Sequence, residues 1–100
     1  MLQYTVIATL PDEPTRSEYI AWLKAGHVQA VIDAGASTGL IIRIDEPATP
    51  PRVETRYTFP SRESLDRYLR DTAPRLRADG LASFGPDRSV TFERRIGSII

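Results

Sequence analysis

Four segments of the chain alternate between apolar and polar residues, the pattern of a β-strand with one buried face. They span residues 2–10, 37–45, 52–59 and 89–96. The apolar set of each segment predicts the face that packs on the core. These inward positions are Leu2, Tyr4, Val6, Ala8 and Leu10; Leu40, Ile42 and Ile44; Val53, Thr55, Tyr57 and Phe59; and Val90, Phe92, Arg94 and Ile96. The opposite face is polar, with Ile7 and Ile41 as the main exceptions.

A helix is predicted between the first two strands. Thr15 followed by Glu18 has the spacing of a capping box, so the helix is expected to begin near Arg16, and Gly35 has the position of its C-terminal cap. At ~100° per residue one stripe of this helix faces the sheet. The stripe contains Ile20, Leu23, His27, Ala30, Val31 and Ala34. Trp22 falls on the other side of a regular helix, ~140° from His27.

A second helical region follows the third strand. Ser61 is its expected N-cap, and Pro74 suits the first turn of a further short helix that ends at Gly80. The proline-rich stretch 46–51 reads as the hairpin connection between the second and third strands.

The predicted order is therefore β-α-β-β-α-β. With right-handed crossovers this order gives an α+β fold, the ferredoxin-like split sandwich, in which a four-stranded antiparallel sheet carries its helices on one face. A chain of 100 residues has room for one modest core, so we expect a single domain over residues 1–100.

Composition narrows the function classes. The 13 basic and 13 acidic residues cancel, so no global positive field attracts nucleic acid or anionic lipid. No cysteine is present, which excludes disulfides and thiolate metal sites. The first residues alternate as a strand does and lack the pattern of a signal peptide, and no apolar run reaches the ~20 residues of a membrane span. We therefore expect a cytoplasmic protein without membrane or nucleic-acid partners.

The second half of the chain also resembles a known family. The segment "YTFPSRESLDRYLRDTAPRLRADGLASFG", with "APRLR" as its most specific part, is similar to a bacterial family of domains of unknown function of about this length. That family lies within or close to the dimeric α+β barrel superfamily. The resemblance implies a homodimer and supplies no activity. The wider superfamily includes cofactor-free monooxygenases of aromatic polyketides, haem enzymes, lactone isomerases and effector-sensing regulators.

His27, the only histidine, is the candidate catalytic residue. A pKa of ~6.5 suits imidazole to proton transfer, and the helix stripe directs His27 at the sheet. The alternative is a core histidine whose ring nitrogens bond a tyrosine hydroxyl or a backbone carbonyl. One histidine without cysteine or nearby carboxylates does not make a zinc site, and a haem would need a cavity this chain can hardly enclose. No metal and no cofactor are expected.

Four further residues are candidate ligand contacts. Tyr4 and Tyr57 lie on inward faces of neighbouring predicted strands, where either hydroxyl could reach His27. Arg94 is the one charge on an inward face, so it is paired, reaches water at the strand end or receives an anionic ligand group. Trp22 is expected to pack under the proline-rich loop, to cover a pocket mouth or to lie in a subunit interface. Gly26 weakens the helix beside His27, which close packing, a bound ligand or a kink would explain.

Two functions remain open at this point. One is a homodimer that binds a small hydrophobic or anionic molecule between the first helix and the sheet. The other is a cofactor-independent enzyme, similar to a monooxygenase or an isomerase, in which His27 transfers a proton. The enzyme needs a cavity beside His27 on which Tyr4, Tyr57 or Arg94 converge, whereas a binding or structural module would show His27 tightly packed and hydrogen-bonded. An RNA-binding role is disfavoured because the predicted outward face lacks aromatic residues.

Overall fold

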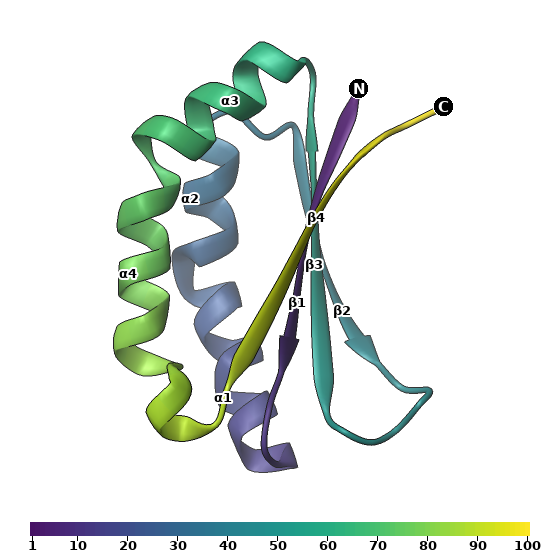
Figure 1. Cartoon of the computed structure of the whole chain (residues 1–100), viewed down its shortest axis with the longest axis vertical. Coiled ribbons are helices and arrows are strands. Elements are labelled where there is room, and N and C mark those ends of the chain that lie inside the picture. Colours follow the sequence, from purple (N-terminus) through teal and green to yellow (C-terminus); the bar gives the residue numbers. More distant parts are fainter.

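The computed structural model of the protein describes all 100 residues, arranged as a sheet with helices on one side (Figure 1). The elements are β1 (Leu2–Thr9), α1 (Glu13–Trp22), the π-helical segment η1 (Leu23–His27), α2 (Val28–Asp33), β2 (Thr38–Ile44), β3 (Arg52–Phe59), α3 (Arg62–Asp71), α4 (Ala73–Ser83), the 3-10 turn η2 (Pro86–Arg88) and β4 (Thr91–Ser98). No helix is both long enough and apolar enough to cross a membrane.

The sheet has the strand order β2-β3-β1-β4, and every neighbouring pair is antiparallel. β1 and β3 are central, so they are covered by a strand on each side, and Tyr4 of β1 lies directly opposite Tyr57 of β3. This order and the two helical crossovers confirm the predicted ferredoxin-like fold. The predicted hairpin is also confirmed, since β2 and β3 pair across the proline-rich connection.

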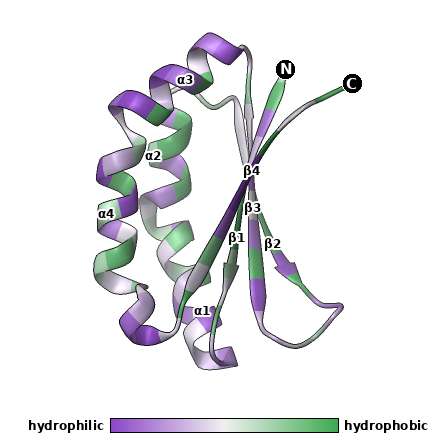
Figure 2. Ribbon diagram, viewed as in Figure 1, coloured by the Kyte–Doolittle hydropathy of each residue, from purple (hydrophilic) through white to green (hydrophobic).

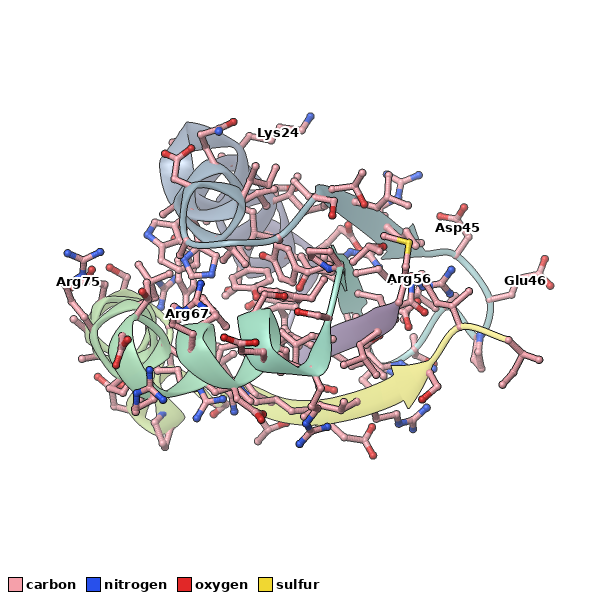
Figure 3. All side chains as sticks on the ribbon, turned by 90° about the horizontal axis from the view of Figure 1, so that it is seen from above. Lys24, Asp45, Glu46, Arg56, Arg67 and Arg75 are labelled. Carbon is pink, nitrogen blue, oxygen red and sulfur yellow. The ribbon has the colours of Figure 1, made fainter.

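The core lies between the sheet and the helical layer. One cluster of buried residues, which includes Tyr57, Phe59 and Leu65, joins the sheet to α2 and α3, and a second, which includes Leu23 and Phe84, joins it to α1 and the end of α4. In Figure 2 hydrophobic and hydrophilic residues follow one another along the strands, whereas much of α3 is hydrophilic. Seen from above in Figure 3, side chains fill the space between the layers, while the labelled Lys24, Asp45 and Arg75 extend outward.

The predicted orientation of β2 is wrong. Ile41 lies opposite Thr55, and Gly39 lies opposite Tyr57, so these two β2 residues face the helices. Leu40 and its alternate neighbours Ile42 and Ile44 therefore lie on the open face, where Leu40 is 57% exposed. Gly39 explains why this face of β2 packs against the helices, because a Cβ at this position would meet Val28 Cγ1 at 2.7 Å. Only glycine lets α2 approach β2 this closely.

Two predicted helix boundaries are also wrong. α1 begins at Glu13 because Asp12, not Thr15, is the N-cap: the Asp12 carboxylate accepts a hydrogen bond of 2.8 Å from the Thr15 N–H. α4 continues past Gly80 to Ser83. Gly80 is buried inside α4, and its position leaves room for the indole of Trp22, which a Cβ there would meet at 3.4 Å. Ser61 caps α3 and Gly35 has a positive φ, both as predicted.

Candidate functional site

The helix between β1 and β2 is interrupted at Gly26. This residue has φ 144° and ψ −15°, a conformation that side-chain-bearing residues rarely adopt, and the N–H of Val28 donates to the carbonyl oxygen of Leu23, five residues back. The segment is a π-bulge, which adds one residue to a helical turn. An added Cβ at Gly26 would meet nothing within 4 Å. The glycine therefore permits a kink and does not serve close packing.

The bulge brings Trp22 and His27 together. Their rings stack with centroids 4.3 Å apart and an interplanar angle of 27°. In an uninterrupted α-helix the two would diverge by ~140°, so the prediction that Trp22 lies away from His27 is wrong. Neither Tyr4 nor Tyr57 bonds His27, whose ring is held by the indole stack. The bulge thus converts two separate helix faces into one aromatic surface.

That surface borders a cavity between α1–η1, α4 and the sheet. The cavity has a volume of about 40 Å³. It is lined by the only tryptophan, the only histidine and all four tyrosines of the chain. The lining residues are Tyr4, Val6, Tyr19, Trp22, His27, Thr55, Tyr57, Tyr68, Leu76, Arg77, Gly80, Leu81, Phe92 and Arg94. All five predicted site residues are among them.

Two of the tyrosines differ in how their hydroxyl groups are satisfied. The Tyr4 hydroxyl accepts a hydrogen bond of 3.0 Å from the Arg77 guanidinium, which reaches across from α4. The Tyr57 hydroxyl is buried and has no hydrogen-bond partner. Thr55, on the same face of β3, is the neighbouring side chain whose hydroxyl acts on the Tyr57 phenol, and this hydroxyl itself donates to the Val6 carbonyl oxygen at 3.4 Å. Buried hydroxyls are rarely left unpaired, so this group marks the cavity as polar in one place.

Burial governs the ionisation of the site. It lowers the pKa of His27 below the ordinary value, and the charge of Asp79 opposes this effect. His27 is therefore neutral at neutral pH, with a nitrogen lone pair available to accept a proton. Burial also raises the pKa of Tyr19, Tyr57 and Tyr68 far above the usual range, so these phenols are hydrogen-bond donors and not bases.

Arg94 reaches water, as one of its predicted alternatives requires. It lies opposite Val6 on the inward face of β4 and lines the cavity, and its side chain is exposed. Its guanidinium lies 5.6 Å from the centre of the Phe92 ring. Arg94 is thus at the rim, accessible from water and from the cavity. No group of three or more histidine, cysteine or carboxylate side chains in the structure could hold a metal ion.

Sequence reasoning missed several lining residues, among them Tyr19 and Arg77. Tyr19 stacks on Trp22 with ring centroids 5.9 Å apart. The available signal was the spacing of Tyr19 from Trp22 and Leu23, which follow it by three and four residues and so lie next to it on the helix surface. A regular helical period through Gly26 places the face of Tyr19 and Trp22 away from the face that carries His27, so the sequence does not indicate that both border one cavity. Arg77 had no such signal, because an arginine of this helix is typical of a solvated surface.

Comparison with known structures shows the same fold in proteins of low sequence identity. A dimeric ferredoxin-like protein from an uncultured marine organism superposes with a TM-score of 0.75 at 16% identity, covering 99% of this chain and 94% of that one. SnoaB, a cofactor-independent oxygenase from Streptomyces nogalater, gives 0.69 at 12% identity, with coverage of 99% and 92%. An EthD family protein from Bacillus halodurans gives 0.69 at 16% identity, with coverage of 98% and 99%.

At the level of sequence, no curated protein matches the chain. One family does, and it extends from the first strand to the last. Residues 1–99 match the domain of unknown function DUF4286, and the chain belongs to this family.

Proposed function

We propose that the protein is a homodimer in which each subunit binds a small aromatic molecule in the cavity between α1–η1, α4 and the sheet. The observation that carries this proposal is the convergence of the only histidine, the only tryptophan and all four tyrosines on that cavity. A purely structural core gains nothing from a buried hydroxyl without a partner, whereas Tyr57 offers such a hydroxyl to a ligand.

The size of the cavity limits what binds. About 40 Å³ holds a few water molecules, since one water needs ~10–15 Å³ of such space, and typical pockets for organic ligands measure ~300–1000 Å³. The ligand is therefore small, with one aromatic ring, and the rim widens when it enters. Leu81, which is 50% exposed, and Arg94 border the cavity and have water beside them into which they can rotate.

Tyr57→Phe tests the proposal. Removing an unpaired buried hydroxyl leaves the free protein as stable as before or slightly more stable, and weakens the binding of a phenol by about fivefold, the loss of one hydrogen bond. Binding is followed in NMR spectra through the single indole N–H signal of Trp22, and stability by urea denaturation. Tyr4→Phe is the matched control, since it removes a hydroxyl that Arg77 already satisfies. Absence of a saturable shift with any single-ring aromatic compound refutes the proposal.

The dimer is supported by the open face of the sheet and by the relative whose name describes a dimeric ferredoxin-like protein. Leu40, Ile42 and Ile44 form an apolar strip on that face. We expect Leu40→Asp to convert a dimer into a monomer in sedimentation at micromolar concentration. Leu81→Asp, a matched change of an exposed leucine on α4, leaves the dimer intact. A wild-type monomer under these conditions overturns this part of the proposal.

The alternative is a cofactor-independent enzyme, monooxygenase-like or isomerase-like, in which His27 accepts a proton from the bound molecule. Its specific support is that His27 is neutral, lines the cavity and is held by ring stacking, which leaves the ring nitrogens open to a ligand. Proton abstraction is measured without any co-reactant by deuterium exchange at the α-carbon of acetophenone. The enzyme accelerates this exchange, and His27→Gln abolishes the acceleration. Equal rates for the two proteins argue for binding alone.

A further inference from the structure

We propose that the ligand is an aromatic carboxylate, whose anionic group is held by the guanidinium groups of Arg77 and Arg94 while its ring occupies the aromatic cavity. This inference rests on the proposed function and specifies its ligand class. It comes from the distribution of charge around the cavity.

The cavity lining contains two arginines and no acidic residue. Eight of the twelve arginines form ion pairs with carboxylates. Arg77 and Arg94 are among the four that form none, with Arg52 and Arg75. Both side chains are exposed, so water solvates their charges in the free protein, and no carboxylate of the protein competes with a ligand for them. The absent carboxylate is the group that a ligand brings.

Both arginines are directed at the same space. Arg77, an exposed residue of α4, reaches the Tyr4 hydroxyl of β1, and this 3.0 Å bond holds its guanidinium beside the cavity. Arg94 projects from the inward face of β4, where the Phe92 ring supports its guanidinium at 5.6 Å. Both guanidinium groups also act on the Tyr68 phenol, which lines the same cavity. Burial raises the pKa of Tyr68, and the positive charges of Arg77 and Arg94 oppose this rise.

The remaining contacts favour a flat ring with a carboxylate. Arginine binds carboxylates through two parallel N–H···O bonds, and one guanidinium nitrogen of Arg77 is already used by Tyr4 while the others remain. Tyr57 offers a donor without a partner. Six aromatic residues, together with the stacked His27, supply ring faces and edges on the other sides. The six are Tyr4, Tyr19, Trp22, Tyr57, Tyr68 and Phe92.

The test compares benzoate with benzamide, which have nearly the same shape and differ in charge. Binding to the intact protein is followed through the indole N–H signal of Trp22. We expect benzoate to bind about tenfold or more tightly than benzamide, since charge-assisted bonds are roughly twice as strong as neutral ones. Arg77→Gln and Arg94→Gln each weaken benzoate binding about tenfold and leave benzamide binding within about twofold. Raising the salt concentration weakens only benzoate binding.

Arg75→Gln is the matched control, because Arg75 is an exposed arginine of α4 without an ion pair that does not line the cavity. It leaves both affinities unchanged. Thermal melts check that each variant folds, and Arg94→Gln alone suffices should Arg77→Gln unfold with the loss of the Tyr4 bond. The carboxylate inference is overturned if benzoate and benzamide bind with equal affinity, or if Arg75→Gln weakens benzoate binding as much as Arg77→Gln and Arg94→Gln do. In either case the cavity still binds aromatic rings. No saturable response to either compound overturns the proposed function as well.

Discussion

The effect of Gly26→Ala on the free energy of unfolding tells whether the helix at Gly26 is a π-bulge or regular, because the two cases predict changes of opposite sign. In an uninterrupted helix, alanine is about 1 kcal/mol more favourable than glycine, so the variant would be more stable than the wild type. In this structure Gly26 has φ 144°, where an L-residue is strained by about 1–3 kcal/mol. Because an added Cβ has nothing within 4 Å, no steric clash contributes and the backbone conformation alone sets the loss.

The free energy of unfolding is measured by urea denaturation monitored by circular dichroism. Ala21→Gly, at an exposed position in the regular part of α1, calibrates the ordinary effect of glycine and lowers stability by about 1 kcal/mol. A second readout is the ring-current shift of the His27 protons, which depends on the stacked indole of Trp22. If Gly26→Ala raises stability by about as much as Ala21→Gly lowers it, the helix is regular and the cavity described above does not form.

Three further predictions concern stability. Asp12→Ala removes the N-cap of α1 and lowers the free energy of unfolding by about 1 kcal/mol in urea denaturation, and an unchanged value would place the helix start elsewhere. Arg16→Met leaves the carbonyl oxygens of Ile44 and Arg52 without their buried donor, lowering stability by about 2–4 kcal/mol; a neutral effect would mean that water replaces it. The pKa of His27 is lowered in the folded protein, so between pH 7 and 5 the unfolded state binds a proton more readily than the folded state does. The free energy of unfolding of the wild type therefore decreases as the pH is lowered from 7 to 5. His27→Gln removes this part of the slope in urea midpoints measured across that range, and identical slopes would contradict the lowered pKa.

The order of elements could be predicted because each strand and helix carries its own period. The orientation of β2 could not be predicted from its own residues. Leu40 and its alternate neighbours are more hydrophobic than the other face, so the local pattern favours burying them. The competing requirement is the approach of Val28 to Gly39, which depends on a contact between segments distant in the sequence. A tertiary contact therefore outweighs local hydropathy at this edge strand.

The individual residues that line the cavity could be predicted from the sequence, but the way in which they come together could not. His27, Tyr4, Tyr57 and Arg94 were placed on inward faces by strand and helix periods, and the structure puts them around one cavity. Trp22 joins them only because the helix gains a residue at Gly26. A sequence pattern gives the composition of a helix face, but it does not reveal that the period changes partway along. The sequence shows that a glycine precedes His27, but it does not show that the helix turns at this glycine so that Trp22 and His27 share a face.

The bulge also suggests how this site is gained or lost among relatives. Deleting one residue at Gly26 restores a continuous helix without disturbing the strands on either side, so such a deletion is compatible with the fold. After the deletion Trp22 and His27 stand four residues apart, which on a regular helix is ~40° around the axis, so both rings stay on one face. Straightening the helix at unchanged length instead keeps them five residues apart and separates them by ~140°. Relatives of unchanged helix length that lack the glycine are therefore expected to vary freely at the positions of Trp22 and His27. Relatives that keep the glycine, or that have one residue fewer here, are expected to keep both.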